Sequence, residues 1–137
     1  MTISTTEEGA TIYYTTDGST PTQNSTQYTG PITVSETTPI RARAFKSSLL
    51  GSKTATATYL IDVPHNLPIV SLVTDPSNLF DTNYGIYTIG TGTDDSAVNG
   101  VNASYPGANF WNDWERDVHF EYIQEDGTLG VALDGGV

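Results

Sequence analysis

The sequence predicts an all-β fold, for three reasons. Its apolar residues gather in short segments rich in β-branched and aromatic side chains, and none of these segments has helical spacing. Clusters of Gly, Pro, Asn and Ser separate the segments, as turns separate the strands of a sheet. Apolar and polar residues alternate in several of them, which is typical of strands with one buried face.

The first half is expected to form four strands, at residues 11–16, 31–36, 39–45 and 54–61. The short connection SETTP favours a hairpin between the second strand and the third. In the third strand, Ile40, Ala42 and Ala44 share one face. Arg41 and Arg43 point away from that face. Four strands bury little apolar area without a facing sheet, so we expect a β-sandwich with its first strand missing.

The stretch YYTTDGSTPT is predicted to be the end of a strand followed by a turn. Asp17 supplies a side-chain acceptor, and Gly18 tolerates the positive φ that a reversal needs. The two hydroxyl residues that follow can satisfy freed backbone groups, and Pro21 prevents the strand from continuing. As a binding site, Asp17 would be a single carboxylate without an acid or histidine near it in the sequence. We therefore predict a turn rather than a site.

The charge of the chain excludes some classes of partner. The net charge at pH 7 is −11. Residues 1–60 hold four acidic and four basic residues, whereas residues 61–137 hold twelve acidic residues and one basic residue, Arg116. This acidic second half repels phosphate backbones, so we expect no nucleic-acid partner. No apolar run of about 18 residues occurs, so we expect no membrane insertion, and cysteine is absent.

Three stretches carry a family resemblance over residues 9–61: GATIYYTTDGSTPT, YTGPITVSETTPIRARAF and the closing TATATYLI. They resemble the module at the C-terminus of chitobiase and related hexosaminidases, also called the fibronectin type III-associated module. The resemblance implies an immunoglobulin-like accessory β-sandwich that lies beside a catalytic domain and has no chemistry of its own.

The second half is expected to form a smaller, incomplete β-rich segment with one short helical turn. Residues 69–74 are apolar and β-branched, which predicts a buried strand. Asp75, followed by proline, can cap a helical turn at residues 77–80. Residues 85–89 predict a further brief strand. The alternation in residues 117–122 and the returning stretch TLGVAL predict a hairpin.

Three blocks in the second half, LPIVSLVTDPSNLFD, GIY and NFWNDWERDVHFEYIQEDGTLG, are followed by DGGV. Over residues 66–137 they resemble the N-terminal segment of the CotH kinase family, which comprises spore-coat-type atypical kinases and secreted bacterial relatives. Asp117 stands where the family pattern has proline, at a strand edge. The resemblance implies ATP-dependent phosphotransfer with a divalent metal in some parent proteins. The lysine and acids for that chemistry are expected beyond Val137, so we assign no catalytic or cofactor-binding residue.

One strand carries the candidate metal ligands. Asp117, His119 and Glu121 alternate along the strand and project from one face, where they can bind a divalent metal. Three polar residues at alternate positions are also what any solvent-facing strand shows. We prefer the second interpretation and assign no metal.

Four aromatic residues close together in the sequence are the candidate ligand-binding residues: Tyr105, Phe110, Trp111 and Trp114. Exposed rings flanked by Asn and Asp are typical of polysaccharide-binding surfaces, because sugar C–H faces stack on rings while hydroxyls bind amides and carboxylates. The same rings can instead pack at a seam between domains, with Arg116 against neighbouring acids. The sequence leaves both interpretations open, and we favour packing.

The sequence thus predicts an accessory sandwich module at residues 1–61, a linker at 62–68 and a truncated CotH-like segment at 69–137. We expect a non-catalytic fragment of an extracellular or cell-surface bacterial protein, with neighbouring domains of the parent chain as partners. The alternative is a carbohydrate-binding module that uses the aromatic loop at residues 105–114.

Overall fold

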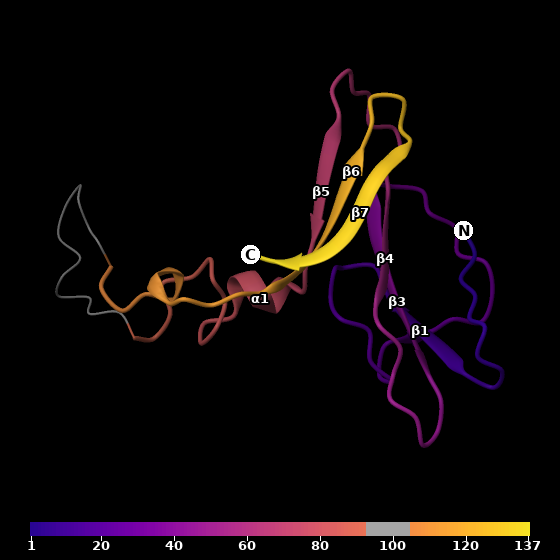
Figure 1. The fold of residues 1–137 in the computed structure, drawn as a ribbon, viewed down its shortest axis with the longest axis horizontal. Coiled ribbons are helices and arrows are strands. Elements are labelled where there is room, and N and C mark those ends of the chain that lie inside the picture. Colours follow the sequence, from indigo (N-terminus) through magenta and orange to yellow (C-terminus); the bar gives the residue numbers. More distant parts are fainter. Residues whose placement is uncertain (93–104) are drawn as a thin grey trace.

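The computed structural model describes residues 1–92 and 105–137, and it confirms the predicted all-β, immunoglobulin-like fold. The described strands form two antiparallel sheets (Figure 1). The first sheet has the order β2-β1-β3-β4 and comprises β1 (Thr11–Thr15), β2 (Thr26–Gln27), β3 (Thr38–Phe45) and β4 (Ala55–Tyr59). The second has the order β5-β6-β7 and comprises β5 (Ile69–Val73), β6 (Asp117–Ile123) and β7 (Leu129–Gly136).

The predicted helical turn is confirmed as α1 (Pro76–Phe80). Asp75 is its N-cap, and the Asp75 carboxylate accepts a hydrogen bond from the Ser77 N–H. A short 3-10 helix, η2 (Asn109–Trp111), lies in the segment between α1 and β6. The described parts of that segment extend away from the two sheets (Figure 1). None of the helices in the described residues is long and apolar enough to cross a bilayer.

The predicted strand at residues 31–36 is wrong, and so is the hairpin built on it. Both edges of β3 are already occupied, by β1 on one side and β4 on the other. The segment instead exchanges two backbone hydrogen bonds with Met1, through the N–H and C=O of Ile32. Two bonds at one point do not make a ladder, so the segment stays extended without joining a sheet.

The predicted strand at residues 85–89 is also wrong. Its backbone N–H groups turn back onto the end of α1: Ile86 donates to the Asn78 carbonyl and Tyr87 to the Leu79 carbonyl. The last carbonyls of a helix have no partner within the helix, so a following segment that supplies donors is held against them. The segment therefore completes the helix end rather than forming a ladder.

The core of the first sheet is centred on β3. Ile40 and Ala42 are buried, as their alternation predicts. Arg41, which the sequence places on the opposite face of β3, is only 8% exposed. The reversal after β1 covers that face of β3, and its Pro21 is fully buried. Both faces of this central strand are therefore covered around Arg41.

The exposure of the two faces of β6 differs from the prediction. Glu121, expected on a solvent-facing side, is only 3% exposed and faces the first sheet together with Ile123. On the opposite side Tyr122 is 38% exposed. The polar side of β6 thus forms part of the contact between the two sheets, and its apolar side is exposed at Tyr122 although Val118 is buried.

Candidate functional site

The turn after β1 has the geometry that its sequence predicts. The Ser19 N–H and Oγ both donate to Oδ1 of Asp17, at 2.9 and 2.5 Å. These bonds lower the pKa of Asp17, the Ser19 hydroxyl contributing most. Gly18 adopts a φ of 83°, a left-handed conformation that glycine accepts without strain. The prediction of a turn is confirmed.

This turn also binds the second half of the chain, which the sequence did not predict. The Thr20 N–H donates to Oδ2 of Asp75 at 2.8 Å, while Oδ1 of the same carboxylate caps α1. Arg41 on β3 also binds the turn, because its Nη1 donates a hydrogen bond to the Gly18 carbonyl at 2.7 Å. Burial opposes ionisation of Asp75, but the hydrogen bonds from Ser77 and Thr20 and the charge of Arg41 outweigh it and lower its pKa.

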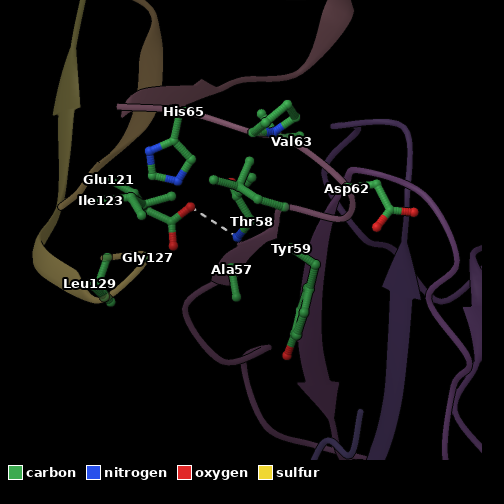
Figure 2. A pocket seen from close by; sticks show the side chains of 12 residues that line it. Ala57, Thr58, Tyr59, Asp62, Val63, His65, Glu121, Ile123, Gly127 and Leu129 are labelled. Carbon is green, nitrogen blue, oxygen red and sulfur yellow. Dashed lines mark hydrogen bonds between the residues drawn. The ribbon is translucent and has the colours of Figure 1, made fainter. Parts of the chain in front are cut away.

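A second bridge joins the sheets near the C-terminal end of β4. Oε2 of the buried Glu121 accepts a hydrogen bond from the Thr58 N–H at 2.9 Å (Figure 2). The Thr58 hydroxyl lies 2.7 Å from the Ser71 hydroxyl, and Ser71 is the β5 partner of Glu121 in the second sheet. The β4 edge therefore donates to a side chain of the second sheet where a further strand would otherwise pair.

This second bridge forms one wall of a groove with a volume of about 860 Å³. Figure 2 shows the side chains that line it, among them Tyr59, Asp62, His65 and Glu121. His65 is engaged locally, with Nδ1 3.0 Å from the Leu67 carbonyl oxygen. Glu121 is the one buried acid of this wall, and its contact with Thr58 is structural. The contacts of Glu121 and His65 therefore indicate that this groove lies at a joint between the two sheets rather than at a catalytic centre.

Replacing Glu121 by alanine is expected to lower the free energy of unfolding by about 2 kcal/mol, because the part-buried Thr58 N–H loses its acceptor. Glu121→Gln retains an acceptor oxygen and is expected to lower it by less than about 1 kcal/mol. Urea unfolding of the two variants and the parent chain measures the difference. Equal losses in the two variants would show that the hydrogen bond does not hold the joint.

Two of the three candidate metal ligands are bound to other residues in the structure. Nδ1 of His119 lies 2.7 Å from Oδ1 of Asp134 on β7. Glu121 is bound to Thr58, and Asp117 is exposed at the start of β6. Within residues 1–92 and 105–137, no group of three or more His, Cys, Asp or Glu side chains is placed to hold a metal.

The four aromatic residues of the predicted loop fall into two groups. Tyr105 and Phe110 meet edge to face with ring centroids 6.3 Å apart, and Phe110 tilts against Trp111 at 5.5 Å. Phe110 is 44% exposed and Trp111 65%. These three residues form the first group, which we call the aromatic cluster.

Trp114 lies apart from the aromatic cluster and has a packing role. The Arg116 guanidinium lies over the Trp114 ring at 4.7 Å and over the Tyr84 ring at 5.5 Å. Arg116 also donates from Nε and Nη2 to the Tyr84 carbonyl, at 3.0 and 2.6 Å. The charge of Arg116 is thus used on rings and a carbonyl rather than on the acids expected from the sequence.

Comparison with known proteins gives one match, to the first sheet and the residues before it. Residues 1–58 match the family model of the chitobiase/beta-hexosaminidase C-terminal domain. This confirms the first of the two resemblances. We call residues 1–58 the chitobiase-type module; the chitobiase C-terminal domain that it resembles is a non-catalytic accessory domain. The match ends within β4, so it includes Thr20, Arg41 and Thr58.

The family model does not extend to residues 59–137. No curated protein and no solved structure matches the chain. The resemblance of residues 66–137 to the CotH family therefore stays a prediction, as does the division of the chain at residues 62–68.

The residues that join the halves were not identified from the sequence as a site. The sequence indicates Asp75 only as a helix cap and Thr20 only as part of a turn. Arg41 and Glu121 share one sequence feature: each is a charged residue between two apolar neighbours in a strand. Only the structure shows that both are buried. Alternation alone places such residues on the solvent side.

Proposed function

We propose that the chain is a non-catalytic accessory and structural fragment of an exported bacterial CotH-like protein, at the cell surface or outside the cell. In this proposal the chitobiase-type module is held against the opening strands of a larger domain. Phosphotransfer, with ATP and a divalent metal, would belong to the parent and to residues beyond Val137. The observation that carries the proposal is the apolar outer face of the second sheet.

That outer face consists of two cross-strand rows. Val70, Tyr122 and Val131 form one row, and Leu72, Phe120 and Leu133 form the other. The β5 and β7 members are 47 to 59% exposed. A patch of six large apolar side chains on one sheet face is more than scattered surface hydrophobics, and such patches mark contact surfaces. The CotH resemblance supplies the occupant: the rest of the domain to which these strands belong.

The absence of cysteine from the chain allows a direct test. Val131→Cys places a single thiol on the apolar face, and Leu50→Cys places one on a loop of the first sheet, where Leu50 is 98% exposed. We expect both thiols to react rapidly in the 137-residue chain. In a longer chain that adds the CotH-like domain proposed to follow Val137, the thiol at 131 should be protected and the thiol at 50 should not.

Two results would contradict the proposal. One is an unprotected thiol at position 131 in the folded longer chain. The other is ATP turnover by the 137-residue chain alone, measured as phosphate release with magnesium or manganese present.

The aromatic cluster favours a second candidate function, polysaccharide binding. Trp111 and Phe110 are exposed, adjacent and tilted, and the exposed Asn112 and Asp113 follow them. Rings of this kind offer faces to sugar C–H groups, while the amide and carboxylate offer hydrogen bonds to hydroxyls.

Retention on insoluble chitin and cellulose tests this second function. A Phe110→Ala/Trp111→Ala variant is expected to lose retention, and Tyr87→Ala, which removes a ring that is 79% exposed outside the cluster, is expected to keep it. Trp114 is left intact because Arg116 packs on it. If the parent chain is not retained, or if Tyr87→Ala loses as much, polysaccharide binding by the cluster is rejected.

A further inference from the structure

A second cavity between the two sheets combines an unusual set of charges. Its volume is about 400 Å³, within the range of small-molecule sites. The chitobiase-type module lines it with Arg41, Arg43 and Lys53, which are three of the five basic residues of the chain. From the other side, β6 and β7 contribute Asp117, His119 and Asp134.

Two of these residues have buried polar atoms without a partner. Nε of Arg41 and Nε2 of His119 are the buried side-chain nitrogen and oxygen atoms of the described residues that lack a hydrogen bond. Arg41 uses Nη1 on the Gly18 carbonyl and the Thr20 hydroxyl, and His119 uses Nδ1 on Asp134. Buried polar groups are nearly always hydrogen-bonded. Both residues line the same cavity, so their two unsatisfied atoms indicate that a ligand there would find unused donors and acceptors.

The chemistry of that partner follows from the atoms that need it. A guanidinium cannot be deprotonated in a protein and has no acceptor, so Nε of Arg41 requires an acceptor oxygen. No carboxylate of the described residues forms an ion pair with Arg41. Burial lowers the pKa of Arg41, and the more distant charges of Asp75, Asp134 and Asp117 oppose this effect. An anionic oxygen that accepts a hydrogen bond from Nε would further stabilise the buried positive charge of Arg41.

The wall of the cavity formed by β6 and β7 requires hydrogen-bond donors from a ligand. Carboxylates of Asp117 and Asp134 accept hydrogen bonds and repel a second anion, so they suit hydroxyl groups. A ligand that satisfies both walls therefore carries a carboxylate at one end and hydroxyls at the other. We propose that this cavity binds a sugar acid, such as a uronic acid, either free or at the end of an acidic glycan. The site is distinct from the aromatic cluster and does not depend on the parent's activity.

Titration of the chain with glucuronate, followed by NMR, tests the proposal. We expect saturable binding that perturbs the His119 ring signals, with glucose and acetate each binding more weakly because each lacks one of the two groups. A glucuronate-terminated oligosaccharide as a further titrant distinguishes the end of a glycan from the free acid.

A matched pair of charge variants locates the site. Lys53→Gln removes a charge from the cavity, and Lys46→Gln removes one that is paired with Glu7 on the surface elsewhere. Lys53→Gln is expected to weaken glucuronate binding by about fivefold, as the loss of one charge-assisted contact does, and Lys46→Gln to leave it unchanged. Both changes are at the surface and should leave the fold intact.

Three results would overturn the proposal: no saturable binding of glucuronate or of the oligosaccharide, equal binding of glucose, or equal weakening by the two lysine variants. The first of these would mean that solvent fills the cavity. The retention assay on neutral chitin and cellulose is independent of all three, so failure of this site and failure of the aromatic cluster can be told apart.

Discussion

Replacing Gly18 by alanine is expected to lower the free energy of unfolding by about 2 to 4 kcal/mol, because two effects add. Gly18 has a φ of 83°, and a side chain in this left-handed region is itself unfavourable by about 1 kcal/mol or more. A β-carbon at this position would also lie 2.8 Å from the Thr74 carbonyl oxygen. That oxygen is backbone next to Asp75, so relief of the contact requires the turn and the second half of the chain to separate.

Gly127 provides the matched control for this substitution. Its φ of 81° is nearly the same, but nothing lies within 4 Å of the β-carbon that alanine would add. Gly127→Ala is therefore expected to lower the free energy of unfolding by about 1 kcal/mol, from the backbone conformation alone. Chemical denaturation of both variants gives the difference. Equal losses would mean that the turn does not press against Thr74 in solution.

The elements predicted correctly are those that the local sequence determines. Asp17 and Gly18 form the predicted turn, and Asp75 caps the predicted helix, because in both cases the acceptor and its donors lie within two residues. The hairpin of β6 and β7 was predicted for the same reason: its turn, at Gly127, lies between the two strands. Turns and helix caps of this kind can be predicted because all their hydrogen-bonding groups lie close together in the sequence.

The joint between the halves could not be predicted in this way. Thr20 and Asp75 are 55 residues apart, and Thr58 and Glu121 are 63 apart. Each pair depends on how two sheets face one another, which no periodicity of either sheet specifies. Glu121 is buried by this contact and Arg41 by the turn after β1. Alternation separates the two faces of a strand but does not show that a polar face is covered. The cavity between the sheets was missed for this reason as well.

Removing the Asp75 carboxylate is expected to have the second largest effect, a loss of about 2 to 3 kcal/mol in Asp75→Ala. The substitution removes the N-cap of α1 and leaves the Thr20 N–H, which is part-buried, without an acceptor. Asp126→Ala is the matched control. Asp126 accepts from the N–H and hydroxyl of Thr128 much as Asp75 does from Ser77, but in an exposed turn that joins nothing else. A clearly smaller loss is expected there.

The pH dependence of stability separates the charge of Asp75 from its packing. The pKa of Asp75 is lowered in the folded state from an ordinary value of 3.8, so the unfolded chain binds the proton more readily. Its contribution is therefore present above about pH 4 and is lost as the pH falls through the lower folded pKa. Asp17 and Asp126, whose pKa values are also lowered, act in the same direction.

Asp75→Asn tests this sign, because asparagine keeps an acceptor for α1 but cannot titrate. Between about pH 6 and pH 3 the parent chain should lose more stability than the Asp75→Asn variant, since only the parent protonates a carboxylate that Ser77, Thr20 and Arg41 stabilise. The remaining loss in the variant belongs to the other carboxylates. Parallel pH profiles would show that Asp75 is not stabilised as an anion. The bridge from the turn to α1 would then rest on geometry alone.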